Sequence, residues 1–187
     1  MRRTRRRSRT DPVAGRRESQ AARLTADELI ERLGLAPLPM EGGLYRETWR
    51  STVQLPGLDA PSGVTRVAGT AIFYLLTPGT SSAMHRLPID EVYHFLLGDP
   101  VEMLQLEDAA PPRRLVLGHD LRAGERLQVV VPAGAWQGSR LRAGGAWALM
   151  SVTVAPGFEF ADYESGDAQA LAAAWPDAAA FVHALAR

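Results

Sequence analysis

Two side chains that can share a proton, His85 and Glu91, lie six residues apart near the middle of the chain. The stretch from Gly79 to Gly98 reads as two strands, and successive residues of a strand point to opposite faces. We therefore expect His85 on the first strand and Glu91 on the second to face one interior. A carboxylate bonded to an imidazole fixes its tautomer and raises its basicity, which suits proton abstraction near neutral pH. The pair predicts acid–base chemistry, with His85 as the base and Glu91 as its orienting partner.

The same alternation selects further residues for this interior. Tyr93 lies two residues beyond Glu91, on the same strand face, and is the candidate proton donor. A second strand-like run, GERLQVVVPAGAWQ, begins at Gly124 and ends at Gln137. The alternating positions of these strands predict the following ligand contacts: Phe95, Gln128, Gln137 and Ser139.

The spacing of these residues resembles the two sequence motifs of the cupin superfamily. The first motif, G-x5-H-x-H-x3-E-x6-G, aligns with residues 79–98, and Leu87 takes the place of its second histidine. The second motif ends in P-x-G-x-x-H and aligns with residues 132–137, where Gln137 replaces the final histidine. The resemblance implies an all-β jelly-roll barrel whose interior is wide enough for one small ligand.

Six blocks in order make the resemblance more specific. Together they are similar to the DUF985, or cupin_5, family of small single-domain cupins, over roughly residues 26–165. Met84 and Tyr93 lie where that family commonly has tryptophan. Membership implies a homodimer. The blocks are EGGLYRETWRS, TAIFYLL, HRLPIDEVYHFLLGDP, LGHDL, VVPAGAWQGSR and VAPGFEFADYE.

The resemblance leaves the role of a metal open. Metal-dependent cupins hold a divalent ion at these motif positions, which here are His85, Glu91 and Gln137, with an apolar residue at the fourth. A protein site normally supplies three or four histidine or carboxylate ligands. This set has two good ligands and a neutral amide. A metal-dependent oxygenase or lyase is therefore an alternative to metal-free chemistry.

Three other interpretations remain beside the metal-dependent one. Some sugar-nucleotide epimerases with a cupin fold use a cavity histidine base and a tyrosine acid without a metal, which favours an isomerase or epimerase acting on a sugar- or carbonyl-containing metabolite. Those enzymes clamp a diphosphate with lysine and arginine. Because this chain has no lysine, the clamp would depend on Arg46 or Arg140. The alternatives are a non-catalytic module that binds a metabolite in the same cavity and a buried polar pair that only stabilises the barrel.

The elements that must position these residues can be read from local signals. Thr25 and Glu28 form a capping box, and Gly34 ends the helix that it begins. Residues 55–63 read as a hairpin loop, and residues 167–187 as one or two helices broken at Pro176. The expected strands, spaced as in a sandwich or barrel, are 44–52, 67–77, 82–87, 91–97, 101–107, 113–118, 126–131, 135–142 and 146–155.

Composition and charge restrict the class of protein. The chain has 187 residues, enough for one domain, which we expect over residues 23–187, with the barrel at about 40–160. Formal net charge is zero, yet eight of the 21 basic residues fall in the first 17 positions. We expect residues 1–22 to be a disordered leader, with a basic arm that binds nucleic acid or an anionic surface as the alternative. The acidic remainder argues against nucleic-acid binding by the barrel. With no cysteine, no apolar stretch of membrane-spanning length and no secretory signal, we predict a cytoplasmic protein.

Overall fold

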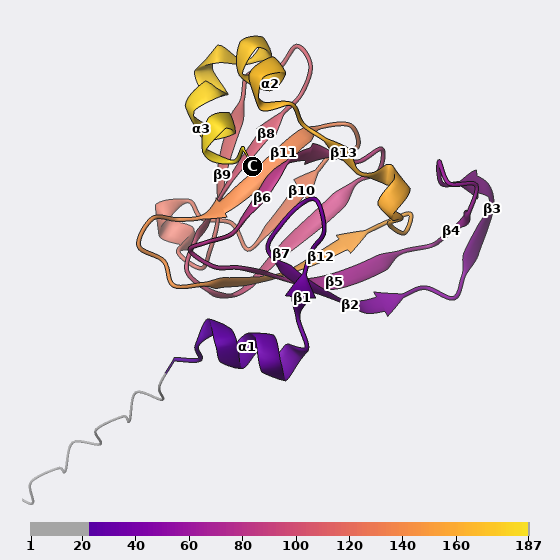
Figure 1. Cartoon of the computed structure of the whole chain (residues 1–187), viewed down its shortest axis with the longest axis horizontal. Helices are drawn as coiled ribbons and strands as arrows, with labels where there is room; N and C mark the ends of the chain where they lie inside the picture. Colours follow the sequence, from indigo (N-terminus) through magenta and orange to yellow (C-terminus); the bar gives the residue numbers. More distant parts are fainter. Residues whose placement is uncertain (1–22, 187) are drawn as a thin grey trace, which may run out of the picture.

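Two antiparallel sheets face each other in the computed structural model, which describes residues 23–186 (Figure 1). The first sheet has the strand order β1-β2-β5-β12-β7-β10, and the second β13-β6-β11-β8-β9. This arrangement confirms the predicted all-β jelly roll. The Arg-rich leader and the terminal Arg187 lie outside the described residues. The strands are β1 (Ala36–Pro37), β2 (Leu44–Arg50), β3 (Gln54–Asp59), β4 (Thr65–Val67), β5 (Thr70–Leu76), β6 (Ser81–Arg86), β7 (Glu91–Gly98), β8 (Val101–Leu106), β9 (Arg113–Leu117), β10 (Gln128–Val131), β11 (Trp136–Leu141), β12 (Ala148–Val154) and β13 (Glu164–Ser165).

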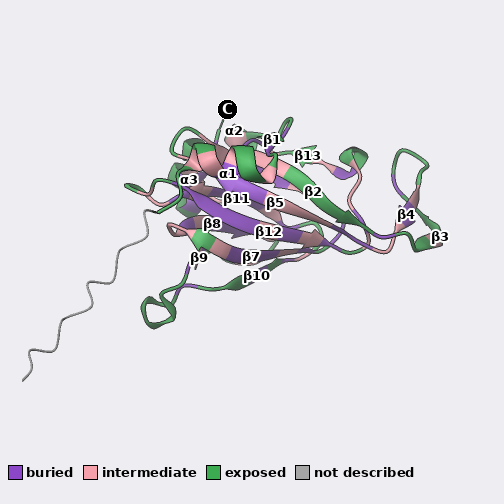
Figure 2. Ribbon diagram, turned by 90° about the horizontal axis from the view of Figure 1, so that it is seen from below, coloured by how far each residue is buried: buried purple, intermediate pink, exposed green. Residues whose placement is uncertain are grey.

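The main core fills the space between the two sheets. Met103 and Leu117 come from the second sheet, and Tyr74, Phe95 and Met150 from the first. All five are at most 5% exposed. Figure 2 shows these buried positions concentrated on the central strands. Alternation along β7 is clean, with Glu91, Tyr93 and Phe95 buried and their neighbours less so. One strand face therefore carries both core side chains and the polar residues that enter the interior.

Helices cover parts of the outer faces of the barrel. The helix α1 (Ala26–Leu33) begins at the predicted capping box of Thr25 and Glu28, and ends at Gly34 in the left-handed conformation. Its Leu29 packs on Leu75 and Leu149 of the first sheet. Short 3-10 turns are η1 (Leu121–Ala123), η2 (Phe160–Asp162) and η3 (Pro176–Ala178).

The C-terminal segment forms two short helices, as predicted, on either side of a turn that starts at Pro176. These are α2 (Ala168–Ala174) and α3 (Ala179–Ala184). Leu171, Phe181 and Leu185 pack with Leu104 and Met84 against the outside of the second sheet. Met84, at a position where the family commonly has tryptophan, therefore belongs to this outer cluster. Its neighbour His85 consequently points inward.

The segment 55–63 is not the plain loop that we predicted. Strand β3 covers residues 54–59 and pairs with β4, and only residues 60–64 form the turn between them. The pair stands out to one side of the barrel (Figure 1) and is largely exposed (Figure 2). Gly57 and Pro56 inside β3 resemble loop residues in sequence, because both residue types are depleted in strands.

A buried ion pair anchors this hairpin to the segment after β12. The two terminal nitrogens of the Arg66 guanidinium donate to the carboxylate of Asp162, at 2.7 and 2.5 Å, and Nη1 also donates to the carbonyl of Gly157 at 3.2 Å. Asp162 additionally accepts from the backbone N–H of Glu159. The pair holds η2, and with it residues 158–163, against the open end of the barrel.

Removing one member of this pair leaves the other charge buried without its partner. We predict that D162A lowers the free energy of unfolding by about 3–5 kcal/mol, measured by urea denaturation. The control E164A removes the exposed partner of Arg86, which is also bound through two nitrogens. Exposed pairs contribute about 0–1 kcal/mol. Equal losses in the two variants would contradict the anchoring role of Asp162.

Candidate functional site

The register of three strands brings His85, Gln137 and Glu91 together inside the barrel. Gln137 on β11 lies directly opposite His85 on β6. Glu91 opens β7 after a short connection from β6. All three side chains are buried, with exposed fractions of 1%, 1% and 6%. The structure therefore places together the three residues that the alternation had selected.

One backbone contact sets the tautomer of His85. Its Nδ1 lies 2.8 Å from the carbonyl oxygen of Ala83. Because a carbonyl can only accept, Nδ1 carries the proton and the neutral ring keeps its lone pair on Nε2. That Nε2 lies 3.2 Å from Nε2 of Gln137, which donates to it. The ring also stacks on Tyr163, with centroids 5.0 Å apart and an angle of 18° between the planes.

Glu91 occupies an unfavourable place for a charged carboxylate. It accepts a short hydrogen bond from the same Gln137 amide nitrogen, and its Oε1 lies 3.9 Å from Nε2 of His85. Burial, with a smaller contribution from the Glu41 carboxylate, raises the pKa of Glu91 well above its usual value, and the Gln137 bond only partly opposes this. Glu91 is thereby held toward its protonated form.

Glu41 is a second carboxylate at the imidazole, and we did not predict it. Its Oε2 lies 3.9 Å from Nε2 of His85, and its Oε1 accepts from the hydroxyl of Ser82 at 2.7 Å. The following glycines hold it there. Gly43 has φ of 68°, and a Cβ on it would lie 2.7 Å from the ring of Tyr74, whose hydroxyl donates to the carbonyl of Gly42. The sequence signal that could have indicated Glu41 was an acidic residue directly before two glycines.

These groups border a cavity of about 290 Å³ between the sheets. That volume lies just below the range of roughly 300–1,000 Å³ that is typical of small-molecule sites. Carboxylates and one arginine interrupt a wall that is otherwise mostly apolar or aromatic. The lining residues are Leu38, Glu41, Tyr45, Glu47, Arg50, Thr70, Ile72, His85, Leu87, Glu91, Val152, Val154, Phe158, Phe160 and Tyr163.

A bulge in β2 determines which charged residues reach this cavity. The pairing of β2 with β5 shifts between Glu47 and Trp49, so the extra residue Thr48 reverses the alternation beyond it. Arg50 consequently faces inward together with Tyr45 and Glu47. Without the bulge, Trp49 would take that face.

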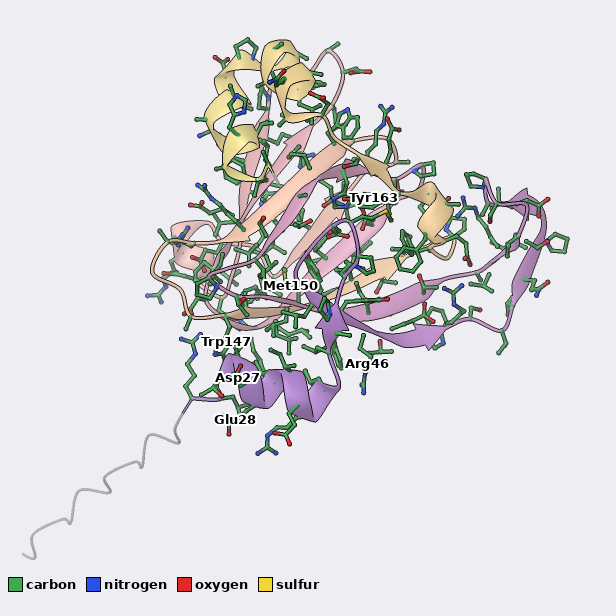
Figure 3. All side chains as sticks on the ribbon, viewed as in Figure 1. Asp27, Glu28, Arg46, Trp147, Met150 and Tyr163 are labelled. Atoms are coloured by element: carbon green, nitrogen blue, oxygen red, sulfur yellow. The ribbon has the colours of Figure 1, made fainter. Side chains whose placement is uncertain are left out.

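Arg46 and Gln128 do not lie where the predictions put them. Arg46 is exposed on the other face of β2 and lies over the ring of Phe73, 5.9 Å away. Figure 3 shows it beside α1, apart from Tyr163. Gln128 is exposed too and contacts Nδ1 of His94 at 3.2 Å. In β10 the odd-numbered residues, such as Val129, are buried, so Gln128 lies on the outer face of the strand.

Three other predicted residues are buried but do not line the cavity. Tyr93, 2% exposed, lies behind Glu91 and Gln137; burial and then the Glu91 carboxylate raise the pKa of its hydroxyl well above its usual value. Phe95 packs in the core and meets the ring of His119 edge-on. Ser139 is 1% exposed on β11. The phenols that do line the cavity are Tyr45 and Tyr163.

The donor set does not fit a divalent metal. Leu87 occupies one motif position, and the amide nitrogen of Gln137, a donor of hydrogen bonds, contacts both His85 Nε2 and Glu91 Oε1 where an ion would have to lie between them. Over residues 23–186, no group of three or more histidine, cysteine, aspartate or glutamate side chains is arranged to hold a metal. The predicted ligands His85, Glu91 and Gln137 therefore bond to one another.

A jelly roll whose two sheets enclose an imidazole and a carboxylate from the first motif, and an amide from the second, is a cupin. The chain belongs to one family of this class: residues 27–166 match Cupin_5, described as cupin superfamily (DUF985). This confirms the resemblance found in the sequence. Within the described residues, no helix has the length and apolar character needed to cross a membrane.

Similar proteins come from distant organisms. A hypothetical protein from Leishmania major is 35% identical, with a TM-score of 0.77 and coverage of 87% of this chain and 99% of its own. Protein SO0799 from Shewanella oneidensis is 35% identical, with a TM-score of 0.78 and coverage of 88% and 99%. The uncharacterized protein YML079W of Saccharomyces cerevisiae is 32% identical over 134 residues, which are 66% of this chain and 66% of the yeast protein.

The raised pKa of Glu91 predicts how stability depends on pH. The pKa of Glu91 is higher in the folded than in the unfolded chain. Such a carboxyl group stabilises the folded state fully at pH values below its unfolded-state pKa, and this stabilisation is lost as pH rises through its folded-state pKa. E91Q cannot ionise. We therefore expect the melting temperature of E91Q, minus that of the wild type, to increase from pH 4 to pH 9. Thermal unfolding followed by circular dichroism measures it.

The matched control for this charge change is E31Q, on an exposed position of α1. Its difference from the wild type should stay flat over the same range of pH. A difference for E91Q that is equally flat, or that falls with pH, would contradict a protonated Glu91.

Proposed function

We propose that this protein binds a small carbonyl- or sugar-type metabolite in its cavity and transfers a proton on it, in an isomerisation or epimerisation, with His85 as the general base. The observation that carries the proposal is the hydrogen bond from Nδ1 of His85 to the carbonyl of Ala83. It directs the basic nitrogen toward the carboxylates and the cavity. A fixed tautomer, a fixed ring orientation and an enclosed apolar site are what a histidine base requires.

The chemical step needs only proton transfers. Nε2 of His85 takes a proton from the carbon beside a carbonyl, and the electron pair of that C–H bond moves onto the carbonyl oxygen. A protonated side chain on the cavity wall stabilises this oxygen, and Glu91, with its raised pKa, supplies such a group. Return of the proton to the carbon, on either face or at the neighbouring atom, completes an epimerisation or an isomerisation.

Gln137 suits both protonation states of His85. With neutral His85, its amide nitrogen donates to Nε2 and to Glu91, and its Oε1 has no hydrogen-bond partner among residues 23–186. Once Nε2 is protonated, rotation of the amide by half a turn presents Oε1 to this new donor and to a protonated Glu91. Gln137 is accordingly a positioning residue that accommodates the transferred proton.

Two tyrosines contribute through their location. Tyr163 stacks on His85 and holds the plane of its ring. Tyr93, which we had expected to be the acid, lies behind Gln137, and its raised pKa keeps it a protonated phenol. A homodimer and a cytoplasmic location stay predictions.

The test is hydrogen exchange at carbon in heavy water. The wild type is incubated with D-glucose, D-fructose, D-xylose and L-rhamnose, and NMR follows loss of the proton signal at the carbon beside the carbonyl, which is C2 in the three aldoses and C1 in D-fructose. We expect exchange with at least one of these sugars, and a rate lower by about 10²–10⁴-fold in H85A. The control H183A removes an exposed histidine of α3 and should retain the full rate.

Exchange that survives in H85A would refute the assignment of the base. A wild type that binds one of the sugars without exchanging its proton would point instead to a module that only binds its metabolite.

A further inference from the structure

Carboxylates outnumber fixed positive charges on the cavity wall. Glu41, Glu47 and Glu91 line it, whereas Arg50 is the one arginine that does so among residues 23–186. The chain has no lysine. Even with Glu91 protonated, two carboxylates face one guanidinium. A ligand therefore meets a wall of negative or balanced charge.

The guanidinium of Arg50 is already bound on several sides. Its Nε and Nη2 donate to the two oxygens of Glu47, at 3.0 and 2.9 Å, and its Nη1 donates to Glu159 at 2.7 Å. Nη2 also donates to the carbonyl of Phe158 at 3.3 Å. A phosphate or carboxylate on the ligand would have to displace one of two acids to reach this charge. Arg50 thus closes the edge of the cavity as part of an ion-pair network.

The arginines considered for a diphosphate clamp lie elsewhere. Arg46 is on the outer face of β2. Arg140 bonds to Glu102 at 2.9 Å and lies over the ring of Phe181, under the C-terminal helices. Neither one lines the cavity. Among the described residues, those that line the cavity therefore offer no cluster of unpaired cations to a phosphorylated ligand.

We infer that the cavity selects an uncharged or cationic ligand of single-ring size, such as an unphosphorylated sugar or an amino sugar, and rejects phosphorylated and nucleotide-linked compounds. Because Glu47 is paired with Arg50, Glu41 is the residue that determines this specificity. The inference deepens the proposed function and rests on it for the identity of the site. Like charges brought together in an enclosed, largely apolar site repel strongly, because little water screens them.

The volume and the wall of the cavity support the size and shape of this ligand. About 290 Å³ holds a single ring more readily than a dinucleotide. Tyr163 and Phe158 offer flat faces, and Leu87 replaces what the first motif would make a histidine. Glu41 supplies a carboxylate that accepts hydrogen bonds from hydroxyl or ammonium groups.

Three probes with one ring and different charges test the inference. Benzylamine, benzyl alcohol and benzoate are titrated at pH 7 into the full chain, and dissociation constants are measured from NMR shifts of the side-chain signals of His85 and Tyr163. We expect benzoate to bind at least tenfold more weakly than benzyl alcohol, and benzylamine at least as tightly. Benzoate binding as tightly as benzyl alcohol, or no shift with any of the three, would overturn the inference.

Two variants show whether Glu41 causes this order. E41Q keeps the size of the side chain and its ability to accept from Ser82, and should reduce the preference for benzylamine over benzoate by at least tenfold. The matched control E31Q should leave it unchanged. An unaltered preference in E41Q would remove Glu41 from the specificity assignment.

Measuring binding apart from turnover distinguishes the inference about ligand charge from the proposed function. The probe titrations involve no chemical step, so they can succeed where hydrogen exchange fails, and the reverse. Exchange that depends on His85 together with equal binding of all three probes would leave the base in place and end the inference about charge.

Discussion

The interior of this barrel depends on the hydrogen bonds of one side-chain amide, that of Gln137. It bonds to an imidazole and to a carboxyl group that both lie almost out of reach of water. Buried polar groups are costly unless they are paired, and an amide pairs with either group whether it is protonated or not. A neutral residue at this position therefore lets His85 and Glu91 remain inside the barrel without a metal ion between them.

The surrounding wall is assembled from segments that are distant along the chain. The loop before β2 delivers Glu41, the bulge in β2 delivers Arg50, and the segment after β12 delivers Tyr163. Each has its own local device: a pair of glycines, an extra residue, and the buried pair of Arg66 with Asp162. The two sheets supply the scaffold, and these three devices determine the chemistry of the cavity.

Sequence patterns predicted the parts of this structure that depend on short-range regularity. Alternation along two strands placed His85, Leu87 and Glu91 on one face, and the capping box placed α1. Alternation alone does not place Arg50, because a bulge reverses it and leaves no mark in the sequence around Thr48. For Gln128 the alternation holds along β10, but we assigned the wrong face to the interior, since Val129 and Val131 are the buried residues.

The contributions of Glu41 and Tyr163 depend on long-range packing. Glu41 reaches His85 because β6 passes beside the loop that precedes β2, with the N–H of Ala83 donating to the carbonyl of Glu41. Tyr163 reaches it because Asp162, one residue earlier, is held by an arginine 96 residues away. No local pattern encodes the approach of Tyr163, and two following glycines are the one local sign at Glu41. At residues 55–63 we predicted a hairpin loop but not the strands β3 and β4, because the proline and glycine of β3 are typical of turns.

The tautomer of His85 is the most direct measure of this account. Nitrogen-15 NMR of the four histidine rings, with His85 assigned by its loss in H85A, separates protonated from unprotonated ring nitrogens. At neutral pH we predict a proton on Nδ1 and a lone pair on Nε2. A ring with its proton on Nε2 and a bare Nδ1 would contradict the bond to Ala83, and with it the presentation of a base to the cavity.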